Sequence, residues 1–404
     1  MISADCIVLT DFRPTQLQRP VAQEALLNYT AWLLATAGCA AAGTRNLAAA
    51  NEIMADTQAT VLRYGINPRH IAQRQLNALP QADDELGATG SSPTLPPLFA
   101  DLLENPGGPE LGRRMSELAT LALRVFRDYY ARQPEAPDHL VHVTCSDHAS
   151  PSAAQRWVSE RGWALTTVTD CQQTGCYATF SAIRSAVALL ARSIVGVPKP
   201  RRRVDIVHTE YLSVHFDPLQ RGPGSVIDST LFGDGFIGYS AFREARFSGP
   251  RTYGLRILAQ HEVLIPDSLD EMRPSLGARN FEVLLSKNVP LLLEGVLPSF
   301  LRRLCAKAGR DFEREKDRML FAIHPGGPKI LDYARDALAL SEAQIRHSRA
   351  VFRGHGNMSS ATIPHVLMNL AADPSVPCGT PILAAAFGPG LTVAGLILER
   401  VQLG

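Results

Sequence analysis

The sequence predicts an α/β protein in which strands and helices are layered on one another. Short apolar runs bounded by turn residues predict strands, and longer segments with apolar residues at helical spacing predict helices. The two kinds of segment are mixed along the whole chain, which favours α/β layers over separate all-α and all-β parts. With 404 residues, the chain is long enough for two domains or for one large duplicated domain. No repeat is visible at the level of sequence.

The first half of the chain contains four predicted strands and four predicted helical segments. The strands are Cys6–Thr10, His139–Thr144, Trp163–Thr169 and Val204–Val214. The helical segments are Ala22–Ala59, Leu111–Arg132, Ala153–Glu160 and Tyr177–Val195. Proline, glycine and acidic residues predict a long surface loop over Pro80–Pro109. The charged, proline-containing stretch Pro198–Arg203 is typical of a linker, so we expect two halves, residues 1–200 and 201–404.

The second half continues the same alternation. Its predicted strands are Ile237–Ala241, Tyr253–His261, Leu320–Ile323, Ile382–Phe387 and Leu391–Val401. Its predicted helical segments are Ser225–Phe232, Phe281–Phe300, Lys329–Leu338, Ser341–Val351 and Ser359–Ala371.

Composition excludes several classes of function. Hydrophobic residues make up 46% of the chain, charged residues 20%, and the net charge is +1, so no electrostatic argument for binding nucleic acid or a membrane exists. The longest apolar runs are too short to span a membrane. The seven scattered cysteines form no CxxC pair and predict reduced thiols in a cytoplasmic protein. His208 and Glu210 share a strand without a further partner at ligand spacing, so no metal is expected.

Cys176 is the first residue with a chemical role. It follows Gly175 and stands at the start of a predicted helix. Free amides and the dipole at a helix N-terminus favour a thiolate, so the sequence predicts a lowered pKa and a nucleophile. The alternative is a buried apolar cysteine. Cys145 and Cys171 lack this placement and are assigned to structure.

Two polar residues lie where apolar sequence breaks into glycine. His324 ends a predicted strand and is followed by Pro325, Gly326 and Gly327, and Asn357 follows Gly356. Either could be an ordinary turn. Together with Cys176 they form one way to build an acyl-transfer site, in which the thiolate attacks a thioester and the other two donate hydrogen bonds to a thioester oxygen.

A turn near residue 70 carries three cationic or titratable side chains. Arg69, His70 and Arg74 either form a solvated face or grip a phosphate. The chain has no Walker loop and no GxGxxG after a strand, so nucleotide binding is not expected.

Five segments resemble the signature blocks of type III polyketide synthases, the chalcone-synthase-like branch of the thiolase superfamily. They are Gln172–Ala178, Leu231–Gly235, His324–Asp332, Gly356–Ile363 and Phe387–Val393. The resemblance covers roughly Val141 to the C-terminus, and the turn after Cys145 is closer to bacterial members. It implies a thiolase-like duplicated five-layer αβαβα fold, with the nucleophile in the N-terminal half and His and Asn in the C-terminal half. It also implies a homodimer.

The resemblance also implies roles for individual residues. Cys176 would carry the acyl chain, while His324 and Asn357 would promote decarboxylation of a malonyl thioester. Substrate-binding positions map onto Phe232, His215, Val283, Ser359 and Gly390, with Val283 in place of an aromatic gatekeeper. Arg69 and Arg74 lie near the place where the family grips the phosphates of CoA. The substrates would be acyl-CoA and malonyl-CoA, with no other cofactor.

The same residues are also compatible with other functions. A ketosynthase-III-like enzyme would take acyl chains from a carrier protein for a single condensation or pyrone-forming coupling, and Lys199 with Arg201–Arg203 is a candidate basic patch for it. A papain-like thiol hydrolase also runs Cys, His, Asn, but the tryptophan expected after the cysteine is absent. A non-catalytic subunit of the same fold would be expected to have lost one of the three residues. The expected product is a pyrone, a resorcinol or a related small polyketide.

Overall fold

The computed structural model describes residues 6–44, 46–80, 82–83, 85–87, 90–191 and 201–404. In these residues the main sheet has nine strands in the order β5-β4-β6-β7-β1-β8-β13-β12-β11. Their bounds are β1 Ile7–Pro14, β4 His139–Thr144, β5 Thr167–Gln172, β6 Arg203–Glu210, β7 Gly235–Arg243, β8 Thr252–Leu264, β11 Leu320–Ile323, β12 Pro381–Gly388 and β13 Thr392–Leu403. Two small ribbons pair β2 (Val21–Ala22) with β3 (Gln73–Arg74), and β9 (Met272–Leu276) with β10 (Phe281–Leu285).

The sheet consists of two halves with the same pattern of strand directions. In the N-terminal half, β4 runs parallel to β6, β6 is antiparallel to β7, and β7 is antiparallel to β1. In the C-terminal half, β11 runs parallel to β12, β12 is antiparallel to β13, and β13 is antiparallel to β8. Within the sheet, the two halves are joined where Val8 and Leu9 of β1 pair with Arg256 and Leu255 of β8. The duplication that the sequence did not display is therefore visible in the strand order.

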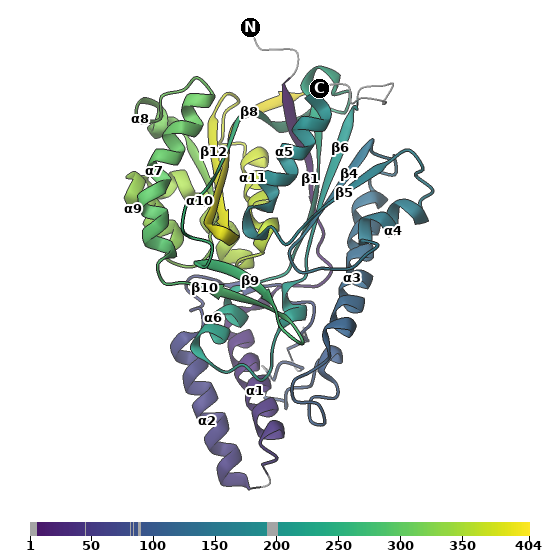
Figure 1. The fold of residues 1–404 in the computed structure, drawn as a ribbon, viewed down its shortest axis with the longest axis vertical. Helices are drawn as coiled ribbons and strands as arrows, with labels where there is room; N and C mark the ends of the chain where they lie inside the picture. Colours follow the sequence, from purple (N-terminus) through teal and green to yellow (C-terminus); the bar gives the residue numbers. More distant parts are fainter. Residues whose placement is uncertain (1–5, 45, 81, 84, 88–89, 192–200) are drawn as a thin grey trace.

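Helices cover both halves and also fill the space between them. Their bounds are α1 Gln23–Ala41, α2 Leu47–Tyr64, α3 Leu111–Ala131, α4 Ala153–Glu160, α5 Ala178–Ala191, α6 Pro223–Leu231, α7 Val289–Lys307, α8 Phe312–Glu315, α9 Ile330–Leu338, α10 Glu342–His355 and α11 Thr362–Ala372. Figure 1 shows α7 and α9 on the left, α5 and α11 in the middle, and α3 and α4 on the right. The helices α1 and α2 extend below the sheet.

Three apolar cores correspond to the interfaces between these layers. The central core joins α5 and α11 to strands of both half-sheets, the second joins α1, α3 and α4 to the N-terminal half, and the third joins α7 and α9 to the C-terminal half. Because both faces are covered, β4 and β6 are buried along their whole length. Buried Ala178, Ala182 and Ala186 let α5 fit between the two half-sheets. The predicted five-layer αβαβα fold is confirmed.

Several predicted elements are displaced. The helical spacing predicted over Ala22–Ala59 is confirmed as two helices, since α1 ends at Ala41 and α2 runs from Leu47 to Tyr64. The strand predicted at Trp163–Thr169 is β5, Thr167–Gln172, and the strand predicted to Val214 ends at Glu210. Phe281–Leu285 is a strand rather than the approach to a helix. The Pro80–Pro109 loop is anchored where the structure describes it, since Phe99 and Leu102 are fully buried.

The predicted boundary at residue 200 falls at the edge of residues 192–200, which lie outside the described residues. Downstream of it, β6 and β7 still belong to the N-terminal half-sheet. No helix among the described residues is both long and apolar enough to cross a membrane.

Gly238 offers a stability test of the N-terminal layer contact. A Cβ atom at this position of β7 would lie 2.4 Å from the ring of Tyr129 in α3. We expect Gly238→Ala to lower the free energy of unfolding by about 1–3 kcal/mol, since overpacking forces neighbours to shift. Gly112→Ala is the matched control, because no atom lies within 4 Å of its added Cβ. The measurement is the midpoint of urea unfolding of each variant. Equal midpoints for Gly238→Ala and Gly112→Ala would contradict the packing described.

Candidate active site

Cys176 and Asn357 occupy matching positions in the two halves. Cys176 lies in the short turn Gly175–Tyr177 before α5, and Asn357 lies just before the turn Ser359–Ala361 that leads into α11. Because α5 and α11 form the central layer together, their N-terminal turns meet. Cys176 Sγ is 3.9 Å from Ser359 Oγ, and Asn357 lies close enough to the thiol to lower its pKa.

His324 comes from a third segment, directly after β11. Its backbone N–H continues the ladder to Ala385 O at 2.9 Å, and its ring packs edge-on against Phe387, with centroids 5.8 Å apart. Asn357 Nδ2 donates to Gly326 O at 3.3 Å, which ties the asparagine to the turn after His324. The three predicted residues therefore converge: Asn357 contacts both the thiol and the turn that carries the imidazole.

The His324 ring has unused hydrogen-bonding capacity. It is fully buried, and neither ring nitrogen has a partner among the described residues. Burial lowers the pKa of His324 to about 3, so the imidazole is neutral at physiological pH. A buried polar group without a partner costs about 1–3 kcal/mol. A carbonyl oxygen of a ligand would satisfy the ring N–H and recover this cost.

The predicted low pKa of Cys176 is wrong for the free protein. Burial raises the pKa of this thiol to about 12, hydrogen bonds from Ser359 and Asn357 lower it, and Glu210 raises it. The neutral state of His324 explains why no imidazolium offsets the burial. The desolvation of the sulfur outweighs the effect of the helix N-terminus.

This protonation state predicts the pH dependence of Cys176 alkylation. Only the thiolate reacts, and below a pKa of about 12 its fraction rises tenfold per pH unit. We expect the rate of iodoacetamide labelling of Cys176 to rise continuously between pH 7 and pH 10. Peptide mapping measures the labelling of this cysteine. A plateau reached at or below neutral pH would contradict this and indicate a resting thiolate–imidazolium pair.

A second thiol, assigned to structure from the sequence, lies beside the site. Cys145 Sγ accepts the Gly175 N–H at 3.1 Å, and Cys145 N–H donates to Glu210 Oε2 at 3.0 Å. Glu210 is fully buried and also accepts a short hydrogen bond from Ser360 Oγ. Cys145 thus supports the turn that carries Cys176. Cys145 precedes Cys176 by about thirty residues, and no local sequence pattern indicates that the two segments are in contact.

His215 is held by a fixed set of contacts beside Ser146, the residue that follows Cys145. Its Nε2 donates to Ser146 O at 2.8 Å, its Nδ1 accepts the Phe281 N–H at 3.2 Å, and its ring stacks on Phe281 at 4.3 Å. These bonds assign the neutral tautomer with the proton on Nε2, and burial lowers the pKa of His215 to about 4. Val283, predicted to line the pocket, is 40% exposed. Phe281, two residues earlier in β10, is the aromatic side chain that packs on His215.

The remaining predicted substrate positions differ in their relation to the thiol. Phe232 ends α6 and forms a parallel bridge with Asn357. Ser359 is buried, and its N–H donates to Asn357 Oδ1 at 2.9 Å. A Cβ on Gly390 would instead meet Leu264 and Leu269. The role of Gly390 in substrate binding stays a prediction, and Gly388, two residues earlier, is a glycine whose added Cβ would lie 3.4 Å from Cys176 N.

The two arginines predicted to grip phosphate have different surroundings. Arg69 is exposed, its Nε contacts His70 Nε2 at 3.1 Å, and Arg353 donates to its carbonyl oxygen. Arg74 is fully buried and donates to Gln23 and to backbone carbonyls of residues 229 and 232. The prediction that Arg74 meets a phosphate is wrong, because solvent and ligand phosphates cannot reach it.

The candidate basic patch for a carrier protein is far from the thiol. Arg203 starts β6 and Glu210, which neighbours Cys145, ends it. Seven residues of strand separate them by about 23 Å, given a rise of about 3.3 Å per residue. Arg203 is moreover buried against Asp205. Lys199 lies outside the described residues.

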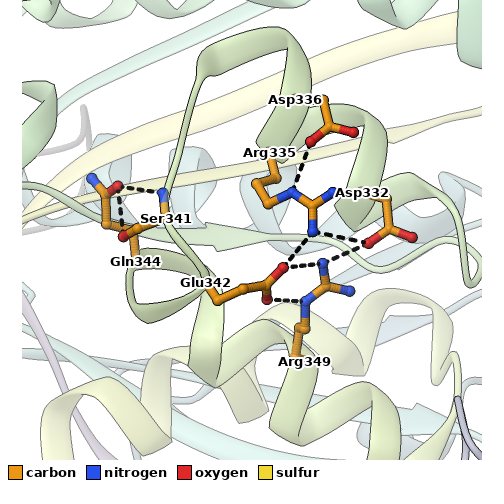
Figure 2. A network of polar contacts seen from close by, with 7 residues as sticks. All are labelled: Asp332, Arg335, Asp336, Ser341, Glu342, Gln344 and Arg349. Carbon is orange, nitrogen blue, oxygen red and sulfur yellow. Dashed lines mark hydrogen bonds and ion pairs between the residues drawn. The ribbon is translucent and has the colours of Figure 1, made fainter.

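An ion-pair network joins α9 and α10, the two helices between His324 and Asn357 in the chain. Figure 2 shows Arg335 and Arg349 sharing Glu342, while Arg349 also contacts Asp332 at 2.6 Å. Asp332 and Arg335 belong to α9, which follows the His324 turn, and the other two to α10, which ends before Asn357. The pairs are exposed or partly exposed, so solvent screens each of them. Their number indicates a fixed spacing between the two segments.

Nothing in the described part of the chain brings three His, Cys, Asp or Glu side chains together as a metal site. His208 Nδ1 instead contacts Ser360 Oγ, and Glu210 accepts from that same hydroxyl. His208, Ser360 and Glu210 are thus hydrogen-bonded to one another. Fold and site together define a protein of the thiolase-like class with a cysteine, a histidine and an asparagine at its centre.

Comparisons with known proteins agree with this class. Residues 256–402 match the family model described as the C-terminal domain of chalcone and stilbene synthases. The chain is 31% identical over 256 residues to the 1,3,6,8-tetrahydroxynaphthalene synthase of Streptomyces coelicolor, covering 63% of this chain and 64% of that protein. It is 29% identical to the Streptomyces griseus protein of the same name, over 64% of this chain and 66% of that protein. The matched region spans less than two thirds of these relatives.

Solved structures extend the similarity over nearly the whole chain. The PKS-I structure from the brown alga Ectocarpus siliculosus has a TM-score of 0.78 at 19% identity, and the comparison covers 98% of each chain. The S. coelicolor tetrahydroxynaphthalene synthase structure has a TM-score of 0.73 at 23% identity, covering 97% and 99%. The C-terminal part of the chain is therefore similar to chalcone and stilbene synthases, and the fold is that of the type III polyketide synthase structures.

Proposed function

We propose that this protein is a decarboxylating condensing enzyme, a transferase that joins an acyl starter to malonyl thioesters. The observation that carries the proposal is the meeting of a partly buried Cys176 with a buried Asn357 and with a buried, neutral His324 whose ring nitrogens have no partner among the described residues. Three such groups in one water-poor place fit thioester chemistry, in which a sulfur holds the chain and two donors hold an oxygen.

The proposed reaction has two stages. Cys176 attacks the starter thioester, forms an S-acyl bond and releases the CoA thiol. His324 and Asn357 then donate hydrogen bonds to the thioester oxygen of malonyl-CoA, so that loss of CO2 leaves an enolate held by both. The enolate carbon attacks the acyl carbonyl on Cys176, forms the C–C bond and frees the thiolate. Each donor is worth about 3 kcal/mol in such a role.

We propose CoA thioesters as substrates and no additional cofactor. Two relatives named for tetrahydroxynaphthalene formation support malonyl-derived chains, and a pyrone, resorcinol or related cyclic product follows from that chemistry. Arg69 on its exposed turn is the proposed phosphate contact. The distance of Arg201–Arg203 from Cys176 disfavours a carrier protein using that patch. A homodimer remains part of the proposal.

The test is to incubate the purified protein with malonyl-CoA and a panel of acyl-CoAs. We expect CO2 release that depends on a starter, together with cyclic polyketides detected by liquid chromatography and mass spectrometry. The control is the same panel with acetyl-CoA replacing malonyl-CoA. Absence of CO2 release with every starter, on CoA and on a carrier protein, would overturn the proposal.

A further inference from the structure

Arg74 is a buried cation directly behind the segment that presents Asn357. Its side chain is fully buried, and in the described part of the chain it forms no ion pair. Its Nε donates to Gln23 Oε1 at 2.7 Å, and its Nη1 donates to Ser229 O at 3.0 Å and to Phe232 O at 2.5 Å. The guanidinium therefore serves the end of α6 rather than a carboxylate.

The carbonyl groups at the end of α6 are shared among three partners. Arg74 takes those of residues 229 and 232, and Gln23 Nε2 takes Thr230 O at 2.8 Å. Leu231 O, which lies between them, accepts the backbone N–H of Asn357 at 3.0 Å. Gly233 N–H returns a bond to Asn357 O at 3.0 Å. The backbone of Asn357 is thus docked on a strip of carbonyls whose direction Arg74 fixes on both sides.

The alkyl part of Arg74 also shapes the turn before Asn357. Gly356 has a φ of +71°, which favours glycine, and an added Cβ would lie 2.6 Å from Leu231 O and 2.9 Å from Arg74 Cδ. The side chain of Arg74 is therefore the wall against which the Gly356 turn packs.

We propose that Arg74 is a positioning residue for the reaction. It holds the carbonyl groups at the end of α6, which bind the backbone of Asn357 and so fix the position of its side-chain amide. The role rests on the proposed function, because it assigns Asn357 to the decarboxylation step. Arginine suits the position, because Nε reaches Gln23 while Nη1 reaches the end of α6, and lysine has only one nitrogen for these separate places. Burial lowers the pKa of Arg74 to about 9, which leaves the guanidinium charged at neutral pH.

Arg74→Lys tests the inference with two readouts. We expect amide hydrogen exchange of Asn357 and Gly233 to speed up at least about tenfold, because the carbonyl strip loses two of its bonds. We expect malonyl-CoA decarboxylation to fall about tenfold to a hundredfold, while starter acylation of Cys176, read by intact mass, stays within about threefold. A general loss of folding would lower both reactions together.

Arg114→Lys is the matched control. Arg114 is equally buried and also donates to backbone carbonyls, those of Pro109, Val214 and Phe216. The Arg114→Lys variant is expected to be less stable. The backbone amide of Asn357 should stay protected from hydrogen exchange, and the ratio of decarboxylation to acylation should not change. If Arg74→Lys does not fold, Gln23→Leu, which removes the Nε partner, should give the same pattern at smaller amplitude.

Unchanged exchange at Asn357 in Arg74→Lys, or the same ratio of reactions as in Arg114→Lys, would overturn the inference. Failure of the wild-type protein to decarboxylate malonyl-CoA would refute the proposed function instead. In that case the exchange measurement still decides whether Arg74 sets the place of Asn357.

Discussion

Cys176→Ala is expected to carry no acyl group after incubation with any acyl-CoA. Product formation should fall at least about a thousandfold, because the step that holds the growing chain is lost. Intact-protein mass spectrometry measures the adduct. Cys378→Ala is the control, since Cys378 is exposed in the loop before β12 and should be acylated like the wild type.

Peptide mapping locates the adduct in the wild-type protein. Cys145 hydrogen-bonds the turn next to Cys176, and burial raises the pKa of its thiol well above the ordinary value. We therefore expect the acyl group on Cys176. An adduct found on Cys145, or an acylated Cys176→Ala protein, would contradict the assignment of the nucleophile.

Asn357→Asp is expected to lower malonyl-CoA decarboxylation about a hundredfold to a thousandfold. A carboxylate keeps an acceptor for the Ser359 N–H but removes the Nδ2 donor, and its negative charge repels a developing enolate. Release of CO2 from labelled malonyl-CoA measures the step.

Asn105→Asp is a chemically matched control for this variant. Asn105 Nδ2 donates to Gly108 O at 2.8 Å, as Asn357 Nδ2 donates to Gly326 O, but it lies in the loop before α3. Its decarboxylation rate should remain within about twofold of the wild type. If Asn357→Asp were as active as Asn105→Asp, the amide would have no part in stabilising the enolate.

The placement of Cys176, His324 and Asn357 could be predicted from the sequence because each follows a local rule. A glycine before a helix, a strand that ends in glycine and a small-residue turn are all readable within a few residues. Their convergence could not be derived from these rules alone, since it depends on a duplication visible only in the strand directions.

The errors share a physical origin in long-range packing. The sequence placed Arg74 on a turn with Arg69, where a cation is ordinarily exposed, but Arg74 lies in β3 and is covered by carbonyls about 155 residues away, at the end of α6. Phe281 and Val283 belong to a hairpin whose position relative to His215 no local pattern encodes. The raised pKa of Cys176 likewise follows from burial in the assembled fold, which outweighs the local effect of the helix start.

The most direct test of the central claim is a stepwise intact-mass experiment on the wild-type protein. The protein is first loaded with a starter acyl-CoA, freed of excess reagent, and then given malonyl-CoA. The account predicts a gain of one acyl group on Cys176, followed by loss of that adduct, release of one CO2 and appearance of a CoA thioester longer by C2H2O. An acyl adduct that stays unchanged while malonyl-CoA remains intact would contradict the account.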